Sequence, residues 1–123
     1  MSKPTILIVD DEPFNIEICK AYLEDQFIIE EAGSGPECMA FLANQPTPDL
    51  ILMDWMMPNP NGLECTSLIR QDEKLKPTPV VIVSAKGNSD EIAYARTFPI
   101  DDFLVKPFEE DELVAMVHKH LKT

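Results

Sequence analysis

Five polar residues stand at the ends of short apolar stretches in this sequence, and their side chains suit the handling of a charged group. They are Asp10, Asp11, Asp54, Ser84 and Lys106. Three carboxylates brought together repel one another strongly, so something positive must offset them. A divalent cation with oxygen ligands and the Lys106 ammonium would both do so. With the Ser84 hydroxyl they would form a cradle for a tetrahedral oxyanion. Phosphoryl transfer needs such a cradle, because its catalysis is mostly positioning and charge neutralisation.

The elements that must position these residues alternate between strands and helices. Short apolar, β-branched runs predict strands at residues 5–9, 27–31, 49–54, 80–83 and 101–105. Apolar residues at helical spacing predict helices at residues 14–24, 36–43, 63–70, 90–97 and 109–121. Five repeats of strand and helix predict an α/β fold, (βα)5, with a doubly wound parallel five-stranded sheet. The ligand site of such a sheet lies outside the carboxyl ends of its strands, where the five polar residues fall.

Three helices carry more specific expectations. The first has one apolar stripe, formed by Ile18, Cys19, Tyr22 and Leu23. Phe14 and Ile16 lie off this stripe, so their exposure would need a reason. Ser89 is the expected N-cap of the helix at 90–97. His118 and His120 are expected to complement the dipole at the end of the last helix, on different faces.

Composition excludes several classes of protein. The chain has 123 residues, which suits one domain. With 10 Lys and Arg against 22 Asp and Glu, its formal net charge of −12 argues against binding nucleic acid or anionic lipid. No apolar stretch has the length of a membrane span or a signal peptide, so a cytoplasmic location is expected. The cysteines Cys19, Cys38 and Cys65 lack metal-site spacing and are expected to be reduced and structural.

Four motifs, each at a predicted strand end, resemble a known family. They are Asp10-Asp11, Asp54-Trp55-Met56-Met57-Pro58 with Gly62, Ser84-Ala85, and Lys106-Pro107-Phe108. In this order and spacing they resemble the receiver domain of two-component response regulators, the chemotaxis-regulator-like family, over roughly residues 5–121. The resemblance implies a flavodoxin-like strand order of 2-1-3-4-5. It also implies a single receiver domain over residues 1–123, without an output domain, that is not an enzyme beyond its own phosphorylation and dephosphorylation.

The resemblance also implies a role for each matching residue. Asp54 would accept a phosphoryl group from a phosphohistidine, and Lys106 and Ser84 would contact that group. Mg²⁺, or Mn²⁺, would be held directly by Asp11, Asp54 and the Met56 backbone carbonyl, and through water by Asp10. Phe103, three residues before Lys106, matches the family's aromatic switch position. A cis bond between Lys106 and Pro107 is also implied.

Partners follow from the same resemblance. The phosphodonor would be a histidine kinase or a histidine phosphotransfer protein, and Phe14, Asn15, Ile16 and Ile18 are candidates for docking it. A downstream effector protein would receive the signal, with the chain as a monomer or a phosphorylation-dependent dimer. Trp55 departs from the smaller aliphatic residue more usual after the phosphoacceptor, and it is expected to pack beside the site.

Several alternatives stay open at this point. The chain could be a receiver module of a larger regulator or hybrid kinase, or a pseudo-receiver that only docks or dimerises, although all the pocket residues are present. A phosphatase with an aspartyl nucleophile would want a second acid two residues after Asp54, where Met56 stands. A flavodoxin-like FMN carrier needs a phosphate loop after the first strand, where Asp10 and Asp11 would repel a phosphate.

Overall fold

The computed structural model describes residues 3–121, and it alternates five strands with five helices. The strands are parallel and lie in the order β2-β1-β3-β4-β5, so the expected fold class and strand order are confirmed. The strand bounds are β1 Thr5–Val9, β2 Ile28–Ala32, β3 Leu50–Asp54, β4 Val80–Ser84 and β5 Asp102–Val105. The helix bounds are α1 Pro13–Leu23, α2 Gly35–Asn44, α3 Gly62–Gln71, α4 Ser89–Ala95 and α5 Glu110–His120.

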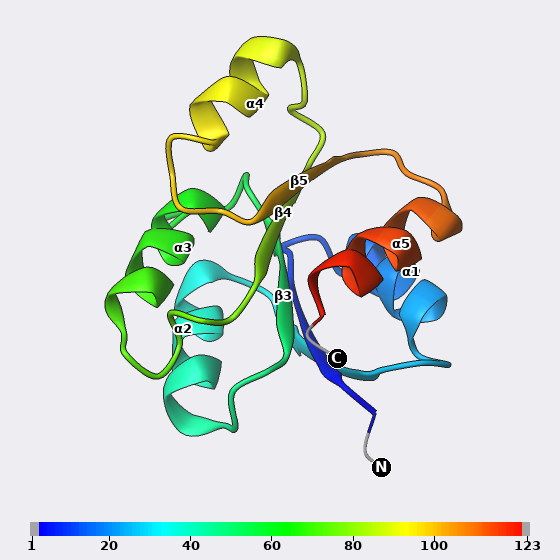
Figure 1. The fold of residues 1–123 in the computed structure, drawn as a ribbon, viewed down its shortest axis with the longest axis horizontal. Coiled ribbons are helices and arrows are strands. Elements are labelled where there is room, and N and C mark those ends of the chain that lie inside the picture. The colour runs from blue at the N-terminus through cyan, green and yellow to red at the C-terminus, as the bar shows by residue number, and fades with distance from the viewer. Residues whose placement is uncertain (1–2, 122–123) are drawn as a thin grey trace.

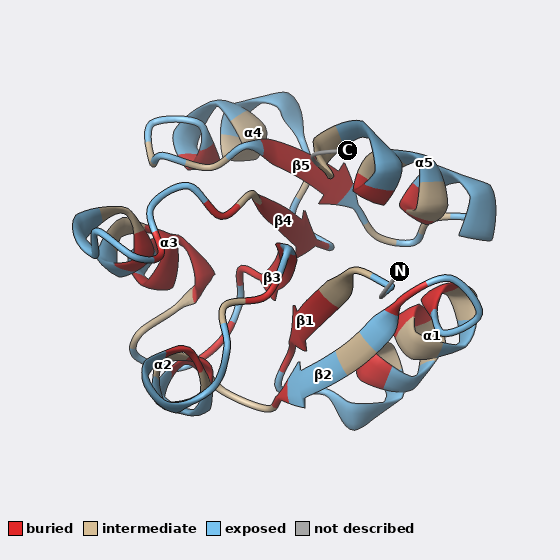
Figure 2. Ribbon diagram, turned by 60° about the horizontal axis from the view of Figure 1, so that its bottom comes forward, coloured by how far each residue is buried: buried red, intermediate tan, exposed pale blue. Residues whose placement is uncertain are grey.

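The helices cover both faces of the sheet (Figure 1). One apolar cluster packs α2, α3 and α4 against one face, and a second packs α1 and α5 against the other. The central strands β3 and β4 are buried throughout, whereas the edge strand β2 is largely exposed (Figure 2). Because every connection crosses over a face, the carboxyl ends of all five strands meet at one edge of the sheet.

Two expectations about the helices were wrong. Ile16 is 6% exposed and belongs to the face of α1 that packs on the sheet, together with Cys19 and Leu23 at a spacing of three and seven residues. Ile18 is only half-buried at the border of that face. Ile16 is therefore a core residue and is not available to a docking partner.

The N-cap of α4 is Asn88, not Ser89. The Asn88 side chain accepts a hydrogen bond from the backbone N–H of Glu91, and the Glu91 carboxylate accepts one from the backbone N–H of Asn88. This reciprocal capping box satisfies two backbone donors at once, whereas a Ser89 cap would satisfy one. The predicted helix boundary therefore shifts by one residue.

The strand predicted at residues 5–9 matches β1 at both ends, and the other boundaries differ from the predictions by at most two residues. The largest difference is in α4, which ends at Ala95 rather than at residue 97. Phe27 is buried but precedes β2, and its backbone N–H bonds to the carbonyl of Leu23 at the end of α1. All three cysteines are free and buried. Within residues 3–121, no helix is long and apolar enough to cross a membrane.

Candidate functional site

Three carboxylates converge at the carboxyl edge of the sheet. Asp10 and Asp11 follow β1, and Asp54 is the last residue of the neighbouring strand β3. One carboxylate oxygen from each residue lies within 4.8 Å of the others. Asp10 and Asp54 are buried, at 5% and 7% exposure, whereas Asp11 is exposed. Two of these carboxylates are therefore buried and one is open to solvent, and the three, together with Lys106, are called the acidic pocket below.

Lys106 supplies the fixed positive charge of this pocket. Its Nζ donates to Asp10 Oδ2 at 2.9 Å and to Asp54 Oδ1 at 3.4 Å. The residue comes directly after β5, and its backbone N–H bonds to the Ser84 carbonyl at the end of β4. The peptide bond between Lys106 and Pro107 is cis, as expected. One ammonium thus bridges two carboxylates, while the third lies beside them.

Burial and the neighbouring charges shift the pKa values of Asp54 and Lys106. Burial and the neighbouring Asp10 charge raise the pKa of Asp54 to about 6, against a partial lowering by Lys106. Burial alone would lower the pKa of Lys106, but its hydrogen bond to Asp10 and the charges of Asp54 and Asp10 raise it. Asp54 is therefore a carboxylate whose charge is poorly compensated by the protein alone, and it would gain from a further cation.

The loop after Asp54 is built to bring α3 close to the site. Asn61 caps α3, because its side chain accepts from the Glu64 backbone N–H and the Glu64 carboxylate accepts from the Asn61 backbone N–H. A Cβ atom on Gly62 would lie 2.1 Å from the Asp54 carbonyl oxygen. Only glycine permits this approach, so Gly62 ties the start of α3 to the backbone of Asp54.

Two further predicted site residues are Ser84, the last residue of β4, and Met56, two residues after Asp54. Ser84 is fully buried at the end of β4, beside β3, and its hydroxyl accepts a hydrogen bond from the Lys86 backbone N–H. The Met56 side chain is 48% exposed. Within residues 3–121, no backbone N–H donates a hydrogen bond to the Met56 carbonyl. The five polar residues that the sequence places at strand ends thus lie at the carboxyl edge of the sheet.

An aromatic cluster lies behind Asp54. Trp55 is 8% exposed, its ring stacks on Tyr94 of α4 with centroids 6.0 Å apart, and Phe103 of β5 meets it edge-on at 6.2 Å. The expectation that Trp55 packs beside the site is confirmed. Phe103 is 7% exposed and belongs to the apolar cluster under α2, α3 and α4. Its ring is therefore already turned inward.

Sequence reasoning missed two participants in this region. Tyr94 is 55% exposed, yet one face of its ring covers Trp55. Asp102, directly before Phe103, is a buried carboxylate with several basic partners. An aspartate within a predicted apolar strand was the only available signal. His120 reaches Asp102 across 18 residues, while His118 bonds Gln26, so the two histidines do point to different neighbours.

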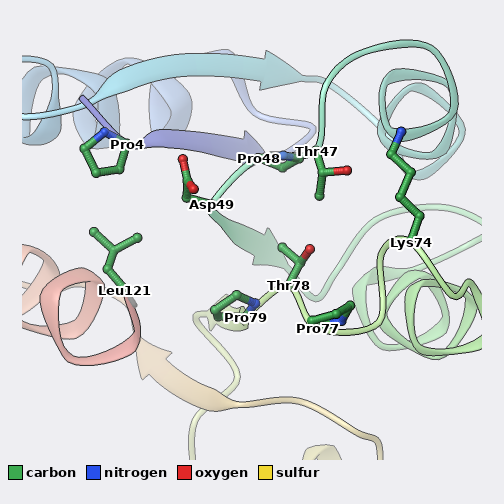
Figure 3. A pocket seen from close by; sticks show the side chains of 9 residues that line it. All are labelled: Pro4, Thr47, Pro48, Asp49, Lys74, Pro77, Thr78, Pro79 and Leu121. Carbon is green, nitrogen blue, oxygen red and sulfur yellow. The ribbon is translucent and has the colours of Figure 1, made fainter. Parts of the chain in front are cut away.

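Two of the hollows on the described surface differ in their relation to the acidic pocket. A groove of about 420 Å³ separates α1 from the turn after β5, and it is lined by Asn15, Ile18, Cys19, Tyr22, Ala85, Lys106, Pro107 and Phe108. The other, of about 330 Å³, lies at the amino edge of the strands (Figure 3). Its Asp49 carboxylate already accepts from the Thr5 backbone N–H. Only the first hollow shares a residue with the acidic pocket.

The chain is similar to a known family of proteins. A family model described as the response regulator receiver domain matches residues 6–118. The phosphate regulon transcriptional regulatory protein PhoB of Klebsiella pneumoniae is 33% identical over 119 residues, which cover 91% of this chain and 49% of that protein. The chain thus spans about half the length of the curated relatives it matches.

Solved structures share the fold. A putative response regulator from Chloroflexus aurantiacus matches with a TM-score of 0.90 and 28% identity, over 96% of this chain and 97% of that one. The receiver domain of the sensor histidine kinase PA1611 from Pseudomonas aeruginosa, with a magnesium ion coordinated in its active site cleft, matches with a TM-score of 0.88 and 25% identity. That match covers 97% of this chain and 98% of the other.

Proposed function

This chain belongs to the response regulator receiver domain family, and from that premise we propose that Asp54 accepts a phosphoryl group from a phosphohistidine in a Mg²⁺-dependent step. It is a receiver domain of two-component response regulators, a signalling module rather than a member of an enzyme family. The observation that carries the proposal is the position of Lys106. Its ammonium lies between Asp10 and Asp54 at the edge of the sheet, so a phosphoryl group on Asp54 would meet a fixed positive charge.

The donor set fits Mg²⁺ or Mn²⁺. Hard cations prefer oxygen ligands, and three carboxylate oxygens here lie within 4.8 Å of one another. Asp11, Asp54 and the Met56 carbonyl would hold the ion directly, and Asp10 would help through water. When bound, the ion would offset the repulsion among the carboxylates and neutralise charge on the phosphoryl oxygens.

The transfer itself needs few protein groups. An oxygen of the ionised Asp54 carboxylate attacks phosphorus, a P–O bond forms, and the P–N bond to the donor imidazole breaks. The electron pair leaves with the imidazole nitrogen, which takes up a proton from water. Lys106 pairs with the transferred group and the Ser84 hydroxyl donates to one of its oxygens. Hydrolysis by water then returns Asp54 and phosphate, so the module catalyses only its own phosphorylation and dephosphorylation.

Phosphorylation adds charge where a single carboxylate stood, about −2 in place of −1 near neutral pH. Ser84 and Lys106 are drawn toward the new oxygens. Phe103 lies on β5, beside the strand that ends at Ser84, and its ring packs against Trp55. The ring follows the movement of Ser84 and Lys106, so phosphorylation changes the face formed by α4, β5 and α5. We propose that a downstream effector protein binds this altered face, with the chain as a monomer or a phosphorylation-dependent dimer.

The donor is proposed to dock on α1. Phe14 is 72% exposed at the start of this helix. Asn15 and Ile18 line the apolar groove that Lys106 also lines. A helix of a histidine kinase or histidine phosphotransfer protein laid along Phe14 and into this groove would bring its phosphohistidine to the acidic pocket. Burial of an aromatic side chain this exposed would supply much of the affinity. A cytoplasmic location is part of the same proposal.

The test is phosphoryl labelling. The wild-type chain, incubated with Mg²⁺ and acetyl phosphate or a phosphohistidine donor, should gain one acid-stable, base-labile phosphoryl group by intact mass. Asp54→Asn should gain none, and Asp90→Asn, an exposed carboxylate at the start of α4, should label like wild type. Equal labelling of Asp54→Asn and wild type would show that another residue is the acceptor. No labelling of a folded wild-type chain by either donor would refute the function.

A further inference from the structure

A second buried carboxylate lies outside the acidic pocket. Asp102 is the first residue of β5 and is 8% exposed. Its Oδ2 accepts hydrogen bonds from His120 Nε2 at 2.8 Å and Lys119 Nζ at 3.0 Å. Its Oδ1 accepts from the backbone N–H of Phe103 at 2.9 Å and lies 3.5 Å from Arg96 Nη2. Four groups from three elements thus converge on one side chain.

These contacts fasten the ends of two helices to one strand. Arg96 is the C-cap of α4, and Lys119 and His120 belong to the last turn of α5. Figure 2 shows β5 between these two helices. Burial of Asp102 would raise its pKa, but the hydrogen bonds from His120, the Phe103 backbone and Lys119 lower it below the usual range. The lowered pKa keeps the Asp102 carboxylate ionised, so that it can hold all of these contacts.

The same residue lies next to the aromatic cluster behind Asp54. Asp102 directly precedes Phe103 and accepts from its backbone N–H, so it fixes the backbone that carries the Phe103 ring. That ring meets Trp55 edge-on, and Trp55 directly follows Asp54. A contiguous set of contacts therefore runs from the acidic pocket through Trp55, Phe103 and Asp102 to the last turn of α5.

We propose that Asp102 is a positioning residue of the switch: it holds Phe103 inward against Trp55 by anchoring β5 to the ends of α4 and α5. This inference rests on the proposed function. It follows that the packing of the last turn of α5 and the occupancy of the acidic pocket are coupled in both directions, because each biases the position of Phe103.

The chain offers a matched control for Asp102. Asp101, one residue earlier, is also an ion-paired aspartate, but its partners are the Arg70 side chain and the Val80 backbone N–H. Those groups lie at the end of α3 and the start of β4, and neither belongs to α4 or α5. Asp101→Asn thus removes an ion pair at the neighbouring residue and leaves the contacts of Asp102 and Phe103 in place.

The experiment uses Trp55, the one tryptophan of the chain, as a probe. Its emission is followed during titration with beryllofluoride, a phosphoryl mimic, in excess Mg²⁺. Asp102→Asn frees Phe103 from its inward position, so beryllofluoride must restore that position. Its half-saturating concentration should rise about fivefold, as for modest coupling between sites. His120→Ala, which leaves Arg96 and Lys119 on Asp102, should give a smaller rise and provides a test should Asp102→Asn not fold.

A second measurement follows the last turn of α5, which is the end of the set of contacts farthest from the acidic pocket. Beryllofluoride should change amide hydrogen exchange at residues 117–120 in wild type and in Asp101→Asn but not in Asp102→Asn. A normal wild-type response, with Asp102→Asn and His120→Ala both titrating like Asp101→Asn, would overturn this inference and leave the proposed function standing. A folded wild-type chain with no response to Mg²⁺ or beryllofluoride would overturn both.

Discussion

Gly62 lies against the backbone of Asp54 so closely that a Cβ atom on Gly62 would sit 2.1 Å from the Asp54 carbonyl oxygen. The first residue of α3 and the proposed phosphoacceptor are eight positions apart, and the intervening loop folds back on itself. The Gly62 and Met57 backbone N–H groups both donate to the Trp55 carbonyl in this loop. The shape of the site thus depends on a residue without a side chain as well as on the residues that carry charge.

The first prediction concerns this contact. Gly62→Ala should lower the free energy of unfolding by about 1–3 kcal/mol, the usual cost of forcing extra atoms into a packed site. It should also weaken Mg²⁺ binding, because the Asp54 backbone must shift. Gly33→Ala is the control, since its Cβ would lie 3.5 Å from the Glu37 carboxylate, an ordinary contact. Urea unfolding of both variants provides the measurement, and equal stabilities would show that the loop adapts freely.

The second prediction concerns Lys106. Lys106→Met removes the ammonium that bridges Asp10 and Asp54, so the metal-free protein should lose about 1–3 kcal/mol of stability at neutral pH. Mg²⁺ should recover more stability in this variant than in wild type, because the ion then offsets the repulsion alone. Lys76→Met is the control, since Lys76 is exposed and its ammonium pairs with the exposed Glu73 carboxylate. A Lys106→Met variant as stable as wild type without metal would contradict the prediction.

The third prediction follows from the raised pKa of Asp54, about 6. At a pH between the usual carboxyl pKa and this value, Asp54 carries a proton in the folded chain but not in the unfolded chain. Stability without metal should therefore rise as the pH falls through 6, and this group should contribute about 1 kcal/mol more at pH 5 than at pH 7.5. Chemical unfolding in the presence of a chelator measures it. Asp54→Asn should remove this contribution, and an unchanged pH slope in that variant would exclude Asp54 as its source.

The fourth prediction concerns the metal. Mg²⁺ at about 100 times its dissociation constant should stabilise the folded chain by roughly 2.7 kcal/mol, because it binds only the assembled pocket. Asp11→Asn, at the exposed carboxylate of the trio, should lose most of this gain. Asp25→Asn, an exposed carboxylate after α1, should keep it. Thermal unfolding with and without a chelator gives the comparison, and equal gains in all three chains would place the ion elsewhere.

Much of this protein follows from local patterns in the sequence. Apolar β-branched runs and helical spacing predicted all ten elements, because burial on both faces of a parallel sheet leaves a continuous apolar strand. The site followed from topology alone, since the carboxyl ends of parallel strands share one edge. Asp10, Asp54 and Lys106 are far apart in the chain, yet each ends a strand or directly follows one, and that was sufficient to predict their meeting.

Other features depended on contacts between elements, which no local pattern encodes. The rotation of α1 about its own axis decides that Ile16 is buried and Ile18 is at the border of the packed face. A small rotation of the helix would exchange the residues that face the sheet. The cap of α4 is different, because Asn88 and Glu91 form a local capping box whose spacing is present in the sequence but was not used in the prediction of Ser89. Asp102 gathers Lys119 and His120 from α5, and only the packing of that helix beside β5 brings these charges to a buried carboxylate.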